Sequence, residues 1–162
     1  MIKGLHHNAY RCRDSEETRK FYEDFLGLPL AGTLWLKITK SGRETDTLHT
    51  FYEMDNGSYL AFFEAPDMEF EFKEQHDFDL HIALEVEHDT LAPMLEKGKA
   101  AGIESRGIAD HHFIDSIYFR DPNGYVIELA APTDSAADYA VEAEKQAHGR
   151  LARWQSTKPI SE

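Results

Sequence analysis

The stretch "DPNGYVIELAAP" (121–132) has the form of a turn followed by a buried strand. The letters DPNG are typical of a turn, and the apolar run after them is typical of a strand. Side chains alternate between the two faces of a strand, so Glu128 shares a face with Val126 and Ala130. A carboxylate in the middle of an apolar strand, between small residues, requires either a partner or a function.

The same kind of turn and strand occurs earlier in the chain. "NGSYLAFFEAP" (56–66) matches "NGYVIELAAP" (123–132) with a slip of one residue, and "HNAYRC" (7–12) matches "HIALEV" (81–86). Two matches in the same order indicate an internal duplication. A duplicated half-barrel places its equivalent strands around a shared cavity.

Period-two alternation, helix caps and turn residues predict the same order of elements, βαβββ, in both halves. The first half has expected strands at 4–12, 34–39, 47–54 and 58–65 and a helix over 14–27. The second half has expected strands at 80–87, 103–110, 113–120 and 125–132 and a helix over 89–102. The chain therefore divides into a first module (1–66), an acidic linker (67–79), a second module (80–132) and a C-terminal part (133–162).

The C-terminal part contains a predicted helix over 135–156. Its alanines, with Leu151 and Trp154, form a stripe at spacings of three and four residues. Such a stripe packs either against its own domain, which is the expectation here, or against a second copy in a homodimer.

Composition narrows the class of protein. The chain has 162 residues, 41% of them hydrophobic, which is enough to bury the core of one ordinary domain. A net charge of −13 argues against nucleic acid and anionic membranes as partners. The single cysteine, Cys12, excludes a disulfide framework or a thiolate zinc cluster. Without a membrane-length apolar run or a signal peptide, we expect a cytoplasmic protein with a small-molecule partner.

Three expected strands carry a metal-ligand type of residue two positions before an alanine. These residues are His7, His81 and Glu128. Two imidazoles and one carboxylate form the ligand set of non-haem Fe(II), and the same set can hold Mn, Ni, Co or Zn. The alternative is structural: strand histidines are often hydrogen-bonded core residues, and Glu128 would then lie on a half-exposed sheet.

The modules resemble a known superfamily. "FYEDFLGLPL" (21–30), "HIALEV" and "YFRDPNGYVIEL" (118–129) are similar to vicinal oxygen chelate proteins. That group includes glyoxalase I, type I extradiol dioxygenases, methylmalonyl-CoA epimerase and fosfomycin- and bleomycin-resistance proteins. Over residues 2–132 the resemblance implies an α+β fold. Its two βαβββ modules form a paired, partly open mixed β-barrel around a metal cavity, and the C-terminal helix is an addition.

Glyoxalase-type members of this superfamily have a fourth metal ligand on the last strand of the first module. The position here that corresponds to Glu128 is Ala61 or Phe62, depending on the alignment, and neither binds metal. Glu64 is nearby and would become a fourth ligand only through a bulge. The alternative for Glu64 is a carboxylate at the rim of the strand.

A three-ligand site resembles that of the extradiol dioxygenase branch. Tyr118 stands ten residues before Glu128, where that branch has a tyrosine that bonds the substrate. The branch also has an acid–base histidine, and the matching residue here is Ser58. His111 or His112 would then supply the missing proton-transfer group, unless both are surface residues.

The resemblance implies Fe(II)-dependent ring cleavage of a catechol-type vicinal diol. Tyr118, His111 and His112 would be catalytic, and the expected pocket wall comprises Phe62, Phe63 and Phe113. One alternative is a lyase or isomerase that uses Zn, Ni or Mn, which Glu64 as a fourth ligand would favour. The other is a protein of the same fold that only binds a small molecule.

Overall fold

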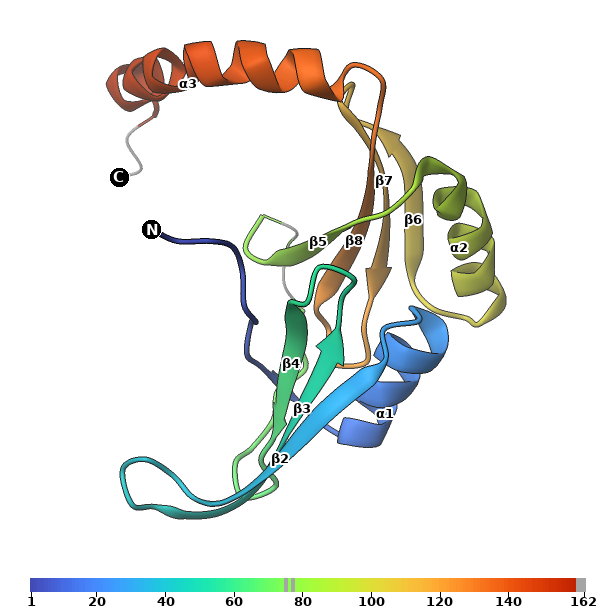
Figure 1. Cartoon of the computed structure of the whole chain (residues 1–162), viewed down its shortest axis with the longest axis vertical. Helices are drawn as coiled ribbons and strands as arrows, with labels where there is room; N and C mark the ends of the chain where they lie inside the picture. Colours follow the sequence, from blue (N-terminus) through green and yellow to red (C-terminus); the bar gives the residue numbers. More distant parts are fainter. Residues whose placement is uncertain (75, 77, 160–162) are drawn as a thin grey trace.

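The computed structural model describes residues 1–74, 76 and 78–159 (Figure 1). It contains two four-stranded mixed sheets with the same internal order, which confirms the predicted α+β class and the two βαβββ modules. The sheet of the first module has the order β1-β4-β3-β2, and that of the second has the order β5-β8-β7-β6. Within the described ranges each sheet is hydrogen-bonded only within itself, so the strands do not close a barrel.

Most strands lie close to the predicted ranges, but the first is shorter than the expected 4–12 and the second begins earlier than the expected 34–39. Those of the first sheet are β1 (Tyr10–Cys12), β2 (Leu30–Ile38), β3 (Glu44–Glu53) and β4 (Tyr59–Glu64). Those of the second are β5 (His81–Glu85), β6 (Ser105–Asp110), β7 (Ile114–Arg120) and β8 (Val126–Pro132). In each sheet one pair is parallel, β1 with β4 and β5 with β8, and the other pairs are antiparallel.

The helices are α1 (Ser15–Arg19), which continues as a π-helical segment η1 (Lys20–Phe25), α2 (His88–Ala100) and α3 (Ala136–Thr157). Asp14 caps α1 by accepting a hydrogen bond from the Glu17 amide at 2.8 Å, as its sequence predicts. Gly27 follows at a φ of +88°, a conformation that favours glycine and ends the helix. In Figure 1, α1 and α2 lie on one side of the sheets and the opposite side is open.

The turn that opens β8 joins the two modules. Asp121 is buried and accepts hydrogen bonds from the Tyr22 hydroxyl at 3.0 Å, the Asn123 amide at 2.9 Å and the Tyr125 amide at 2.8 Å. Asn123 in turn accepts a hydrogen bond from the Arg13 amide at 2.9 Å. Burial raises the pKa of Asp121. A carboxylate from the second module thus holds an aromatic residue of the helix in the first.

Asp121→Ala is expected to lower the free energy of unfolding by about 2–4 kcal/mol, because it removes the carboxylate that accepts from four buried donors, the fourth being the Asn123 side-chain amide at 3.0 Å. Urea denaturation followed by circular dichroism measures this change. Asp55→Ala, at the exposed aspartate in the β3–β4 turn, is the control, with an expected change under about 0.5 kcal/mol. Equal effects of the two substitutions would contradict this role for Asp121.

The C-terminal helix departs from the expectation that its stripe packs against its own domain. No residue of α3 is buried. Near its start the Tyr139 ring stacks on Phe113 at 4.1 Å, and beyond that contact the apolar stripe stays exposed. The helix projects past the end of the sheet that precedes it (Figure 1), so beyond Tyr139 that sheet does not cover the stripe. Among the described residues, no helix is long and apolar enough to cross a bilayer.

Candidate metal centre

Glu128 and His81 meet on the face of the second sheet that α2 leaves uncovered. The parallel register of β5 and β8 pairs Ala83 with Glu128 and His81 with Val126, so the two polar side chains are diagonal neighbours. The His81 Nε2 atom lies 3.2 Å from the Glu128 Oε2 atom. Ile127 and Leu129 point to the opposite face and are buried in the core, as strand alternation predicts.

The distance between the two side chains fits a shared metal ion. Two ligands about 2.1 Å from one metal, at a right angle to each other, lie about 3 Å apart. The side chain of Glu128 is 6% exposed and that of His81 is 41% exposed, so the pair is enclosed on one side and open on the other. This arrangement suits two adjacent ligands with further coordination positions directed outward.

Two hydroxyl groups on the neighbouring strand hold the Glu128 carboxylate. The Ser116 hydroxyl donates to Oε1 at 2.5 Å, and the Tyr118 hydroxyl donates to the same atom at 3.3 Å. Both residues lie on β7, two positions apart and therefore on one face. These two bonds fix Oε1 of Glu128, and the other oxygen, Oε2, faces His81.

Ser116→Ala is expected to weaken Mn(II) binding about 10- to 100-fold, because the carboxylate loses the bond that orients it. Isothermal titration of metal-free protein measures the affinity. Thr50→Val is the control, because Thr50 is a buried hydroxyl residue of the first sheet, away from Glu128. An unchanged affinity in Ser116→Ala would show that Ser116 does not position Glu128.

A histidine extends this group of side chains. The His111 Nε2 atom lies 2.9 Å from the Tyr118 hydroxyl, so Tyr118 connects His111 to Glu128. The Arg106 guanidinium lies 5.0 Å from the centre of the Tyr118 ring. His112 points to solvent, with its Nδ1 atom 4.0 Å from the Asp110 carboxylate. Of the two candidate histidines, the structure therefore brings His111 to the site and leaves His112 outside.

His7 lies in a different environment, on the first sheet. It forms an isolated bridge with Tyr59, and its ring centre is 5.9 Å from that of Phe51 and 6.4 Å from that of His49. Within the part of the chain that the structure describes, no three His, Cys, Asp or Glu side chains form a group able to hold a metal. One chain therefore brings together two of the three predicted ligands.

Comparison with protein-family models identifies the superfamily of the chain. The model of the Glyoxalase/Bleomycin resistance protein/Dioxygenase superfamily matches residues 4–129. The chain belongs to this superfamily. The match spans both modules, and it includes His7, His81 and Glu128. Among curated proteins, none is significantly similar to the chain.

Solved structures of the superfamily share the fold. FosX, a fosfomycin resistance protein from Listeria monocytogenes, is 23% identical with a TM-score of 0.65, covering 84% of this chain and 98% of that one. A variant of FosX in complex with Mn(II) and 1S,2S-dihydroxypropylphosphonic acid is 22% identical, with a TM-score of 0.63 and coverage of 83% and 97%. A superfamily domain from Frankia sp. EAN1pec is 20% identical, with a TM-score of 0.65 and coverage of 82% and 100%.

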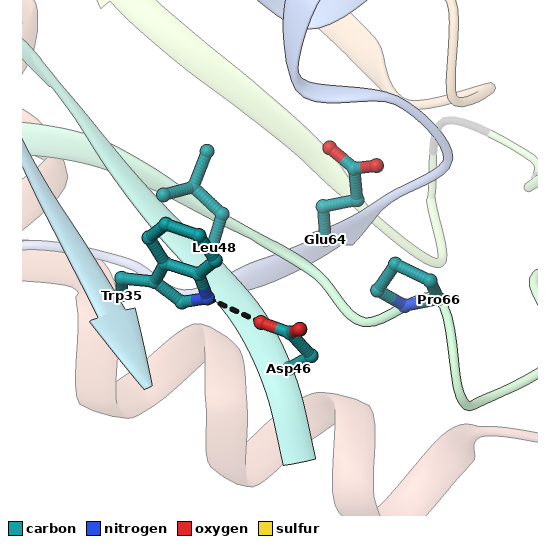
Figure 2. Close-up of a pocket in the computed structure, with 5 residues that line it drawn as sticks. All are labelled: Trp35, Asp46, Leu48, Glu64 and Pro66. Atoms are coloured by element: carbon teal, nitrogen blue, oxygen red, sulfur yellow. Dashed lines mark hydrogen bonds between the residues drawn. The ribbon is translucent and has the colours of Figure 1, made fainter. Parts of the chain in front are cut away.

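Glu64, the candidate fourth ligand of glyoxalase-type members, faces away from His7. It is paired with Leu48 on the face of the first sheet that carries α1, and its Oε2 atom accepts a hydrogen bond from the Ser15 amide at 2.7 Å. Figure 2 shows Glu64 beside a cavity of about 430 Å³, whose wall includes Trp35, hydrogen-bonded to Asp46. Glu64 therefore caps a helix, and no bulge turns it toward the ligand face.

The predicted aromatic pocket wall does not form as one surface. Phe62 is fully buried in the core, with its ring centre 4.6 Å from that of Tyr22, which corrects its assignment to a pocket. Phe63 is on the other face of β4 and stacks on His49 at 3.6 Å. Phe113 stacks on Tyr139 of α3. The reason is alternation, because neighbours in a strand point to opposite faces.

Sequence reasoning missed Ser116 and Arg106. Ser116 is two residues before Tyr118, so alternation alone places it on the Glu128 face. Arg106 pairs directly with Tyr118 across β6 and β7. Cys12 is a buried residue of β1. Burial raises the pKa of its thiol to about 11, which makes it a poor nucleophile.

Proposed function

We propose that the chain is a metal-dependent enzyme that binds a small, oxygen-chelating molecule at His81 and Glu128. The observation that carries this proposal is the 3.2 Å approach of the two side chains on one half-open face. Fe(II) is the metal that the ligand set favours, and Mn(II), Zn, Ni and Co are compatible with it. When bound, the metal would supply Lewis-acid activation of the oxygens of the substrate.

His7 is proposed as the third ligand, contributed by a second copy of the chain. In one copy His7 lies on the first sheet, and the described residues contain no three-membered group of metal ligands. The ligand-bearing face of the second sheet is open on the side away from α2. A dimer that places the first sheet of one copy over that face would complete the set.

Tyr118 and His111 are proposed to handle protons. The Tyr118 hydroxyl lies between Glu128 and His111, so it can pass a proton from the substrate toward the imidazole and back. Ser58 is a poor substitute for the acid–base histidine of the extradiol branch. It is buried in the β3–β4 turn and donates its hydroxyl to Asn56. We therefore propose His111 as the acid–base group in place of the histidine that Ser58 replaces.

Two reaction classes follow from this site. The first is oxygen-dependent ring cleavage of a catechol, which the resemblance to extradiol dioxygenases favours. The second is a reaction without oxygen, as in a lyase, an isomerase or an enzyme that adds water, and the structural similarity to FosX favours it. The ligand in the FosX complex is a vicinal diol that carries a phosphonate, which is also an oxygen chelator.

Anaerobic loading with Fe(II), followed by oxygen uptake with a panel of catechols, distinguishes the two classes. Uptake with a yellow ring-fission product supports the dioxygenase. Tight metal binding without uptake supports the oxygen-independent class, to be tested on epoxides and 2-hydroxy ketones. Tyr118→Phe should lower kcat by roughly 100-fold, as expected for a proton-transfer group. It should weaken metal binding less than Ser116→Ala does, because the bond of Tyr118 to Glu128 is the longer one, at 3.3 Å against 2.5 Å. Absence of metal binding would refute the proposed function.

A further inference from the structure

The chain exposes more surface than a monomer of its size. Its accessible surface is 11082 Å² for a mass of 18.6 kDa. The scaling of surface with mass gives about 8,200 Å² for a monomeric globular protein of that mass. The excess is roughly 2,800 Å² per chain, and two chains together would bury about twice that, in the range of obligate dimers.

Part of the excess lies on α3 and is apolar. The helix of 22 residues is about 33 Å long, and none of its residues is buried. Leu151 and Trp154 are 56% and 58% exposed. Figure 1 shows α3 projecting from the end of β8 across the open side of the molecule. One stripe of the helix comprises Ala136, Ala140, Ala143, Ala147, Leu151 and Trp154.

The stripe occupies one side of α3. At about 100° per residue its members fall within an arc of about 80°, and Val141 lies about 120° from the centre of that arc, outside the stripe. Val141 is also exposed, at 55%. A helix that served only as a solvated tail has no need of such an ordered stripe. Val141 is therefore an exposed apolar position of the same helix outside the stripe, and its substitution is a matched control for substitutions within the stripe.

The distal half of α3 carries the opposite charge from the rest of the chain. Residues 145–158 contain four basic residues and no acidic one, in a chain of net charge −13. The segment 67–74 contains four acidic residues and one lysine. In Figure 1, α3 lies at one end of the molecule and segment 67–74 begins near the other, so the two do not meet in one copy. Between two copies these charges are complementary.

We infer that α3 is an arm that packs on a second copy of this chain. Its apolar stripe covers the open side of the partner, and its basic end meets segment 67–74 of the partner subunit. The surface excess, the unburied stripe and the opposite charges support this inference independently of any metal. By two-fold symmetry each copy donates one arm and accepts one.

Light scattering on metal-free, full-length protein at micromolar concentration tests this inference. The wild type is expected at twice 18.6 kDa, and the double variant Leu151→Asp/Trp154→Asp at 18.6 kDa. Val141→Asp should remain dimeric. A monomeric wild type, or a stripe variant as dimeric as Val141→Asp, would overturn the inference. Circular dichroism confirms that each variant keeps its sheets.

A charge exchange tests where the arm docks. Arg150→Glu/Arg153→Glu is expected to weaken the dimer about tenfold at low salt. Adding Glu69→Lys/Glu71→Lys to the same chain should restore the dimer. Failure to restore it would show that segment 67–74 is not the docking surface. Because these experiments use no metal, a dimer that forms without α3 would overturn the arm while the proposed enzyme function holds. A monomeric wild type would overturn both the arm and the contribution of His7 from a second copy, and metal titration of the wild type would still test His81 and Glu128 separately.

Discussion

Glu128→Gln is expected to weaken Mn(II) binding by at least ~100-fold and to abolish metal-dependent turnover. The substitution keeps the size of the side chain and removes its charge. A neutral amide is a poor ligand for a divalent cation, and one of its two positions becomes a donor that faces Ser116 or His81. The affinity is measured by titration of metal-free protein, and turnover is measured with the substrate panel described above.

Glu85→Gln is the matched control for this effect. Glu85 lies on β5 and pairs with Ala130, so it is on the same face of the same sheet as Glu128. It is exposed, and its loss changes the net charge by the same amount. We expect Glu85→Gln to change the affinity less than threefold, which is the scale of a screened surface charge. If both variants lose Mn(II) affinity to a similar extent, the loss comes from the change in net charge, and Glu128 is not a metal ligand.

Mixed dimers of His7→Ala and Glu128→Gln chains are expected to recover about a quarter of the wild-type metal sites, when the parent proteins have none. If each site takes His7 from one copy and Glu128 from the other, a mixed dimer contains one intact site and one doubly defective site. Random association makes half of the dimers mixed. Joint refolding of the two proteins, followed by metal counting and activity, measures the recovery.

A second mixture controls for nonspecific rescue. His81→Ala and Glu128→Gln remove two ligands of the same module, so no exchange of chains restores both to one site. This mixture should stay inactive. If neither mixture recovers metal sites, His7 does not act across a dimer, and the site would have only the two ligands that one chain brings together.

The sheets could be predicted from the sequence because alternation, turns and an internal repeat agree. The face of Glu128 followed directly from its position in a period-two pattern. The same rule explains the error at Phe62. If the two repeats are aligned at the end of their last strands, Phe62 corresponds to Glu128. If they are aligned at the turn before those strands, Ala61 corresponds to Glu128. The two alignments differ by one residue, which reverses the face of the sheet on which the side chain lies. The pairing of Ala61 with Phe51 places Ala61 on the face of His7.

The position of His7 relative to the other ligands could not be predicted in the same way. Local pattern specifies which face of a strand a residue occupies, but it does not specify how two sheets face each other, or whether they belong to one chain. The expected strand over 4–12 is also shorter in the structure. Only Tyr10–Cys12 forms a regular strand, and His7 is held by one isolated bridge.

The bonds of Asp121 to both modules have a consequence for how the chain unfolds. A duplicated sequence suggests two halves that melt separately, each at its own temperature. The Asp121–Tyr22 bond and the contact of Phe25 with Phe119 tie the helix of one half to the turn and sheet of the other. If either module unfolds, the other module therefore loses buried hydrogen-bond and packing partners. The chain should melt in a single calorimetric transition, in which the repeat behaves as one cooperative unit.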